Sequence, residues 1–116
     1  MLIFHLNNNW FNKIKTGEKT HEYRICNDYW KKRICKLQKD IEYRSKVLDI
    51  TSKYPDKVLI CFANGYPSFD NNDKVLYAVV KKISIVNGIY TDLAIDKPVY
   101  DIEFRLSRIN NEKNTH

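Results

Sequence analysis

The sequence predicts an α+β fold in which a mostly antiparallel sheet, partly closed into a barrel, carries helices beside it. Strand-like segments open and close the chain, helical patterns are collected between them, and turn signals separate the later strands. Strands on both sides of a helical block are typical of α+β domains. Partial closure of the sheet would also hide the edges of its outer strands.

The opening of the chain predicts a strand, a short helix and a glycine stop. Residues 1–6 are an apolar, strand-like run, and the Asn residues at 7–9 are candidate N-caps for a helix. This helix should bury side chains at helical spacing: Trp10, Phe11 and Ile14. Gly17 stands where a helix commonly ends in a residue with positive φ.

Residues 19–25 predict a second strand whose two faces differ in chemistry. His21, Tyr23 and Ile25 alternate with Thr20, Glu22 and Arg24, as a period of two requires. We expect the aromatic and apolar face to pack in the core or at an interface. We expect the charged face to meet a ligand.

The middle of the chain predicts two basic helices. Asn27 or Asp28 can cap the first, which should bury a stripe of three side chains: Trp30, Ile34 and Leu37. A second helix is expected from about Asp40 to the break at Pro55. It is supported by apolar side chains at steps of four, three and four residues: Tyr43, Val47, Ile50 and Tyr54.

Strands are expected again from residue 58 onward. Residues 58–63 form a strand-like run, closed by the turn sequence Asn-Gly-Tyr-Pro at 64–67. A polar loop should span 68–74. Residues 75–86 then predict a long strand that Lys81 and Lys82 interrupt, where we expect a bulge or bend.

The last part of the chain predicts a hairpin, a final strand and a tail. Asn-Gly at 87–88 is a hairpin-turn dipeptide, so a strand pair around it is expected. Residues 100–106 alternate most regularly of all. We therefore expect one domain over 1–109 and a polar C-terminal tail over 110–116.

Composition and charge indicate a folded cytoplasmic domain with one basic region. The 116 residues are 43% hydrophobic, and no run is long enough for a membrane span or a signal sequence. The net charge of +6 is concentrated in residues 13–46, which hold eleven Lys or Arg and five Asp or Glu. A basic face suits a polyanion such as RNA. On charge alone, a pair of well-solvated helices is an equally good explanation.

Metal and cofactor chemistry have no signal in the sequence. Cys26, Cys35 and Cys61 form no Cys-x-x-Cys pair, the histidines share no ligand spacing, and no glycine-rich phosphate loop is present. We expect buried, reduced thiols, with Cys26 beside basic residues as a candidate reactive one. No cofactor is expected.

Residues 14–24, Ile-Lys-Thr-Gly-Glu-Lys-Thr-His-Glu-Tyr-Arg, resemble the signature of ASCH domains, Gly-x-Lys-Thr-x-Glu-x-Arg after a short helix. Residues 29–33 and 62–66 resemble a subgroup of that family, whereas a stretch near 36–57 departs from it and is expected to be a helical insertion. The resemblance implies a PUA-like β-barrel with a cleft between helices and barrel, which binds RNA or modified nucleosides.

The candidate ligand-binding residues combine this resemblance with side-chain chemistry. Arg24 offers a planar fork for a phosphate or carboxylate, Lys19 a compact charge, and Glu22 an acceptor for an exocyclic amine. Aromatic groups beside Arg can stack on bases. The full set is Gly17, Lys19, Thr20, Glu22, Arg24, Trp30, Arg33, Asn64 and Tyr66. Simpler roles are an exposed Glu–Arg pair on the strand, core burial for Trp30, and turn chemistry for Asn64 and Tyr66.

Three functions follow from these residues. The first is a module that binds RNA or a modified nucleotide, with no membrane partner. The alternative is a small hydrolase, either a modified-nucleoside amidohydrolase or a ribonuclease, that uses Lys19 and Glu22 as catalytic groups. In similar amidohydrolases the matching lysine is the base and a threonine at the position of Glu22 is the nucleophile. A purely structural or protein-binding domain is the third.

Overall fold

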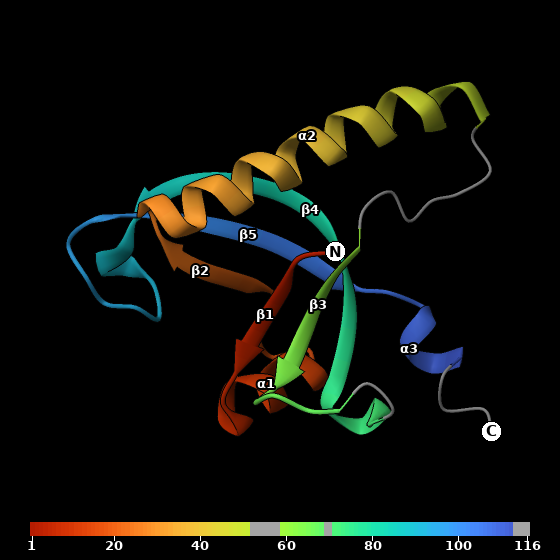
Figure 1. Cartoon of the computed structure of the whole chain (residues 1–116). Helices are drawn as coiled ribbons and strands as arrows, with labels where there is room; N and C mark the ends of the chain where they lie inside the picture. Colours follow the sequence, from red (N-terminus) through yellow and green to blue (C-terminus); the bar gives the residue numbers. More distant parts are fainter. Residues whose placement is uncertain (52–58, 69–70, 113–116) are drawn as a thin grey trace.

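Five strands form one strongly curled sheet, a half-barrel, with helices packed beside it (Figure 1). The computed structural model describes residues 1–51, 59–68 and 71–112. The strand order is β1-β3-β4-β5-β2, and β1 runs parallel to β3 whereas the other pairs are antiparallel. The strands are β1 (Ile3–Leu6), β2 (His21–Ile25), β3 (Leu59–Asn64), β4 (Val75–Asn87) and β5 (Pro98–Leu106). The predicted α+β class with a mostly antiparallel sheet is confirmed.

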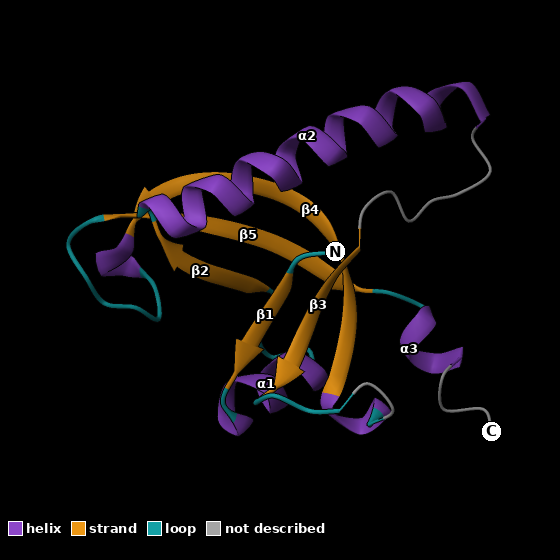
Figure 2. Ribbon diagram, in the orientation of Figure 1, coloured by secondary structure: helices purple, strands orange, loops and turns teal. Residues whose placement is uncertain are grey.

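Within the described residues, three α-helices accompany the sheet: α1 (Asn8–Lys15), α2 (Asp28–Thr51) and α3 (Ile109–Glu112). Figure 2 shows α1 at one end of the half-barrel and α2 crossing the opposite side. Asn7 caps α1 by accepting from the Trp10 amide, and Asn27 accepts from the Trp30 amide at the start of α2. Gly17 follows α1 at φ +83°, as its position predicted. Among the described helices, none is both long and apolar enough to cross a membrane.

Strand β4 is the central strand of the sheet. Its first part, Val75 to Val79, pairs with β3, and the part from Ala78 to Asn87 pairs with β5. The register shifts between Val80 and Lys82, which confirms the irregularity predicted there. A bulge increases local twist and bends a strand, so one long strand can serve both halves of a curled sheet.

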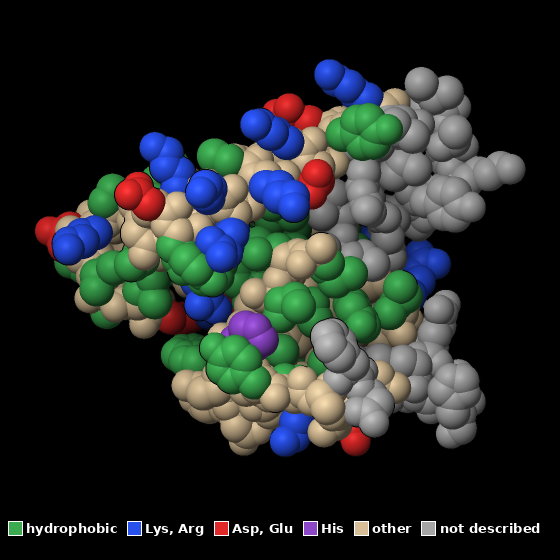
Figure 3. Space-filling model, viewed as in Figure 1, with side chains coloured by type: hydrophobic (Ala, Val, Ile, Leu, Met, Phe, Trp, Pro, Cys, Tyr) green, Lys and Arg blue, Asp and Glu red, His purple; other side chains and the backbone are tan. Residues whose placement is uncertain are grey.

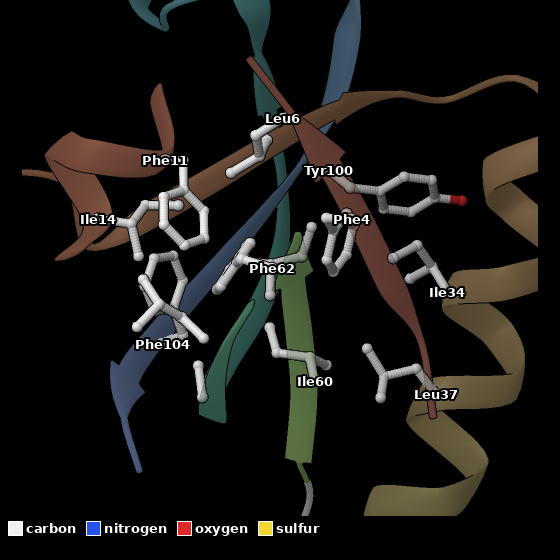
Figure 4. Close-up of a cluster of buried hydrophobic side chains, with 13 residues drawn as sticks. Phe4, Leu6, Phe11, Ile14, Ile34, Leu37, Ile60, Phe62, Tyr100 and Phe104 are labelled. Carbon is white, nitrogen blue, oxygen red and sulfur yellow. The ribbon is translucent and has the colours of Figure 1, made fainter. Parts of the chain in front are cut away.

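The core fills the concave side of the half-barrel (Figure 4). Phe62 of β3 lies at its centre, with ring centroids 5.6 Å from Phe4 and 4.6 Å from Phe104. Helices α1 and α2 close the core from opposite sides. The last two members of each predicted stripe are buried, whereas the first is only partly buried: Phe11 and Ile14 after Trp10 on α1, and Ile34 and Leu37 after Trp30 on α2.

The prediction of two helices in the middle of the chain is wrong, because α2 continues from Asp28 to Thr51 without a break. No Gly or Pro interrupts this stretch. The buried stripe extends to Ile41, which packs against the core, whereas Tyr43 is 70% exposed. The second apolar stripe therefore does not begin as expected, and its last member, Tyr54, lies outside the described residues together with Pro55.

The connection from β4 to β5 also differs from the prediction. The strand pair is confirmed, but residues 88–97 separate the strands, so the Asn-Gly dipeptide is no two-residue turn. Gly88 is buried, and a Cβ there would lie 2.7 Å from the Ile95 carbonyl oxygen and 2.8 Å from Val99 Cγ1. Close backbone approach, rather than positive φ, is what requires glycine at this position.

The start of the expected polar tail belongs to the fold. The Asn110 side chain is buried and forms hydrogen bonds to both backbone groups of Tyr77, accepting from its N–H at 2.8 Å and donating to its carbonyl at 2.6 Å. These bonds attach α3 to β4. Residues 113–116 of the expected tail lie outside the described residues.

Candidate functional site

The inward face of β2 is its charged face. Cross-strand partners project to the same side of a sheet, and β2 places Glu22 opposite Ile102 and Arg24 opposite Tyr100 of β5. Both β5 residues are buried in the core. Glu22 and Arg24 thus continue the concave face at the edge of the sheet, and Glu22 is 5% exposed.

His21 was expected in the core or at an interface, and the core alternative is wrong for the same reason. Its ring lies on the outer face, 34% exposed, with Nδ1 2.7 Å from an Asp101 oxygen and Nε2 3.4 Å from a Glu103 oxygen. The register with β5, whose inward residues are apolar, decides which face of β2 turns inward. The polarity of the β2 side chains does not determine which face of β2 turns inward.

A pocket of about 430 Å³ opens between the two edge strands of the half-barrel. Residues of β1 and β2 form its sides, the first residues of α1 and α2 supply aromatic rings, and the β4–β5 connection closes it. The lining consists of His5, Leu6, Asn7, Trp10, Lys19, Glu22, Tyr23, Arg24, Ile25, Trp30, Asp92 and Leu93. This volume lies within the range of small-molecule sites in proteins.

Charged side chains alternate in sign across the pocket. Lys19 Nζ forms an ion pair with the Asp92 carboxylate and lies 3.8 Å from Glu22 Oε1. Arg24 Nη2 lies 3.8 Å from Glu22 Oε2. The side chains of Lys19 and Glu22 are 9% and 7% exposed and that of Arg24 is 22% exposed, so these charges are largely shielded from water.

Both cations rest on aromatic rings. Lys19 Nζ lies 4.7 Å from the ring centroid of Trp10 and 5.2 Å from that of Tyr23. The guanidinium of Arg24 lies 4.8 Å from the Trp30 ring and 5.2 Å from that of Phe4, and these two rings stack on each other. Cation–π contacts of this kind hold the charged groups in place before any ligand arrives.

Two buried polar atoms in the pocket lack a hydrogen-bond partner within the described part of the chain: Glu22 Oε2 and Arg24 Nε. The other Glu22 oxygen accepts from the Tyr23 N–H at 3.0 Å. Buried polar groups are nearly always satisfied in folded proteins, because leaving one unpaired is costly. An unsatisfied acceptor and an unsatisfied donor therefore lie on neighbouring side chains of the pocket lining.

Burial perturbs two ionisable groups of the pocket. It raises the pKa of Glu22 above the ordinary value, and the nearby charges of Lys19 and Arg24 offset this only in part. It also raises the pKa of Tyr23, with the carboxylates of Asp101, Asp92 and Glu22 acting in the same direction. Glu22 consequently keeps a proton to higher pH than an exposed glutamate, as a group used in acid–base chemistry often does.

Four of the predicted site residues meet in this pocket: Lys19, Glu22, Arg24 and Trp30. Trp30 is half-buried, with one ring face against Phe4, so it contributes both to packing and to the pocket wall. Gly17 and Thr20 instead line a neighbouring recess of about 360 Å³, which Lys19 also borders.

The remaining predicted residues lie elsewhere. Arg33 stacks over the Tyr29 ring on the surface of α2, with its guanidinium carbon 3.4 Å from the centroid. Asn64 donates to the Asn8 side chain at 2.9 Å and joins the end of β3 to α1. Tyr66 is 86% exposed and stacks on His5, a lining residue, so it stands at the pocket rim.

Several pocket residues were missed by the sequence reasoning. Trp10 and Tyr23 were assigned to packing, and His5, Asp92 and Leu93 were not singled out. Asp92 lies 73 positions from its partner Lys19, in a connection that the sequence did not reveal. Trp10 stands near the start of α1 as Trp30 stands near the start of α2, and this likeness was the local signal that could have added Trp10 to the predicted site.

The cysteines differ from expectation as well. Only Cys61 is buried, whereas Cys26 and Cys35 are exposed. Desolvation raises the pKa of the Cys26 thiol, which lowers its thiolate fraction and speaks against a reactive cysteine.

The chain matches no protein-family model, no curated protein and no solved structure.

Proposed function

We propose that this chain binds RNA or a nucleotide-like ligand in the pocket between β1 and β2, as a domain of the ASCH type in the PUA-like superfamily. The motif at residues 17–24 supports the family proposal, since its Lys19, Glu22 and Arg24 positions converge on one pocket. The curled sheet with helices beside it is consistent with a PUA-like barrel. Binding rests on the chemistry of the pocket itself.

The observation that carries this proposal is that Glu22 Oε2 and Arg24 Nε, on neighbouring side chains of the pocket, both lack a hydrogen-bond partner within the described residues. A nucleobase edge presents donors and acceptors side by side in one plane, which complements an acceptor and a donor on adjacent side chains. Trp10, Tyr23 and Trp30 supply rings around this pair. Stacking on aromatic rings together with polar contacts to the base edge is the common way to hold an unpaired base.

Charge supports a phosphate-bearing ligand. Arg24 and Lys19 are the two cations of the pocket, and a protonated Glu22 would leave Asp92 as the one carboxylate that opposes them among the described lining residues. Arg24 can hold a phosphate through two parallel hydrogen bonds. A nucleotide joins both requirements, since it carries a flat base and an anionic group.

Replacement of Arg24 by Ala tests this function. We expect the variant to bind a short single-stranded RNA more weakly by about 1 to 3 kcal/mol, because a bidentate contact is lost. Arg108→Ala, at an exposed position after β5, is the matched control and should bind normally. Affinity of the wild-type chain should fall steeply with salt. Absent or salt-independent binding to every oligonucleotide tested would rule the proposal out.

A hydrolase is the second candidate, favoured by the raised pKa of Glu22 beside Lys19. In this scheme water attacks the acyl carbonyl or phosphate of a bound ligand, and the ionised Glu22 accepts the proton that the water releases. Glu22 then returns that proton to the leaving group, while Lys19 stabilises the negative charge that develops.

Turnover assays separate this candidate from simple binding. A panel of acylated nucleosides and a labelled RNA are incubated with the wild-type chain and with Lys19→Ala and Glu22→Gln. If the chain is a hydrolase, the wild type should form product, and the turnover rate of both variants should be lower by at least about 100-fold. Turnover no higher than that of Lys19→Ala would eliminate the hydrolase.

A further inference from the structure

Helix α2 carries a basic recess on its exposed face, outside the pocket. This shallow, open surface, which we call the α2 groove, lies between side chains of one helix and is bordered by Asp28, Tyr29, Lys31, Lys32, Arg33, Cys35, Lys36 and Lys39. Five cations and one carboxylate therefore line it. Figure 3 shows Lys and Arg side chains spread along this helix.

The cations of the α2 groove outnumber the carboxylate that lines it. Within the described residues, no ion pair involves Lys31, Lys32, Lys36 or Lys39. Lys32 and Lys36 are four positions apart and Lys36 and Lys39 three, so like charges are neighbours on the helix surface. Asp28 stands three and four positions before Lys31 and Lys32, and Asp40 four positions after Lys36, so these carboxylates offset part of the repulsion and cations remain in excess. A polyanion along the groove would relieve this repulsion.

A line of alternating cations and rings connects the groove to the pocket. Arg24 and Trp30 belong to the pocket and are in contact, Trp30 meets the Tyr29 ring edge-on at 5.1 Å, and Arg33 covers Tyr29. Tyr29 and Arg33 line the α2 groove. The two recesses are thus neighbours along one surface path.

We propose that the α2 groove holds the phosphate backbone of a single-stranded nucleic acid whose unpaired base occupies the pocket. The inference rests on the proposed function and narrows it, since the ligand becomes a polynucleotide rather than a free nucleotide. From Tyr29 to Lys39 the helix extends about 15 Å, long enough to follow several phosphates. Single-strand binding commonly combines a basic path with aromatic stacking, as Tyr29, Trp30 and the lysines do here.

The test compares two double variants that lose the same charge. Lys32→Gln/Lys36→Gln removes two groove cations, and Lys74→Gln/Lys97→Gln removes two exposed lysines elsewhere. We would measure the affinity for a fluorescein-labelled 12-nucleotide single-stranded RNA and for a labelled dinucleotide. The salt concentration runs from roughly 50 to 300 mM, a range over which phosphate contacts make affinity depend on salt. Circular dichroism checks that both variants keep the wild-type fold.

We expect the groove variant to bind the 12-nucleotide RNA about tenfold more weakly, and the control variant to match the wild type. Each lysine–phosphate contact to a single strand contributes about 0.7 to the slope of log affinity against log salt. The slope of the groove variant should therefore be shallower by about 1.4. Dinucleotide binding should be unchanged, because it depends on the pocket.

Several outcomes would overturn the inference. Equal slopes for the groove and control variants would show that these lysines do not contact phosphates. Tighter binding of a 12-base-pair duplex RNA, or of vesicles containing phosphatidylserine, would mean that the groove serves a different polyanion. Failure of the proposed function is a separate result: Arg24→Ala would then bind dinucleotide and 12-nucleotide RNA like the wild type, while the groove variant still lost affinity.

Discussion

At the residue scale, the most informative group is Glu22, a buried carboxylate at the edge of the apolar core. Its inward neighbours on β5 are Tyr100 and Ile102, and its charge is balanced by Lys19 and Arg24 at 3.8 Å. Neither distance is that of a hydrogen bond. Burial of a carboxylate without full compensation is unfavourable for stability, so its presence here points to a role in binding or catalysis.

Glu22→Gln should change the pH dependence of stability. Because burial raises the folded-state pKa of Glu22, the folded protein keeps a proton that the unfolded chain has already lost. Stability of the wild type therefore falls as pH rises from the unfolded-state pKa through the folded-state value. Gln cannot ionise, so the variant should gain relative stability over this window, by up to about 1.4 kcal/mol per pH unit.

Urea unfolding from pH 4 to pH 8, in steps of roughly one unit, measures this effect. Glu18→Gln, at an exposed position after α1, is the control and should follow the wild type. A difference between Glu22→Gln and wild type that stays constant with pH would contradict the prediction.

At the scale of the element, the β4–β5 connection links the fold to the site. It delivers Asp92 to Lys19 and Leu93 to the pocket. Gly88 sets its course locally, because the Gly88 carbonyl oxygen accepts hydrogen bonds from both the hydroxyl and the backbone N–H of Thr91. Ala94 adopts φ +50°, an uncommon conformation for a residue with a Cβ.

Gly88→Ala should destabilise the protein by about 1 to 3 kcal/mol, because the new methyl group meets backbone and side-chain atoms that cannot all withdraw. Gly17→Asn is the control: the site is open and Asn tolerates the left-handed conformation. Denaturant midpoints measure both changes. If Gly88→Ala unfolded at the same urea concentration as Gly17→Asn, the close approach would be without energetic effect.

At the scale of the whole molecule, one core couples the parts that bear the site. Phe62 contacts both Phe4, whose other neighbours are Trp30 and Arg24, and Phe104 of β5. The half-barrel thereby brings its two edge strands, β1 and β2, to one pocket although they stand at opposite ends of the strand order.

Phe62→Ala should lower the free energy of unfolding by about 3 to 5 kcal/mol, because it removes a fully buried ring and leaves a cavity. That is a large part of the stability of a domain of this size. Ile85→Ala, at a position 63% exposed, should change stability by less than about 1 kcal/mol. Similar losses in the two variants, measured by thermal or urea unfolding, would show that the core is not centred on Phe62.

Much of the fold could be predicted from local patterns. The strands, the N-cap of α1, the stop at Gly17, the stripe of Ile34 and Leu37 and the irregularity near Lys81 all depend on side chains close together in the chain. The prediction of a break near Asp40 was wrong, because a change in the apolar stripe does not by itself end a helix. Helix α2 continues where it leaves the core.

The sequence by itself determined the strands, α1 and the cluster of Lys19, Glu22 and Arg24, because each depends on residues that are close together in the chain. Tertiary structure alone decided which face of β2 turns inward, since that depends on its register with β5. It also decided that Asp92 meets Lys19 and that Trp10 and Trp30 flank the same pocket. Those contacts join segments far apart in the chain, and only the curl of the sheet brings them together.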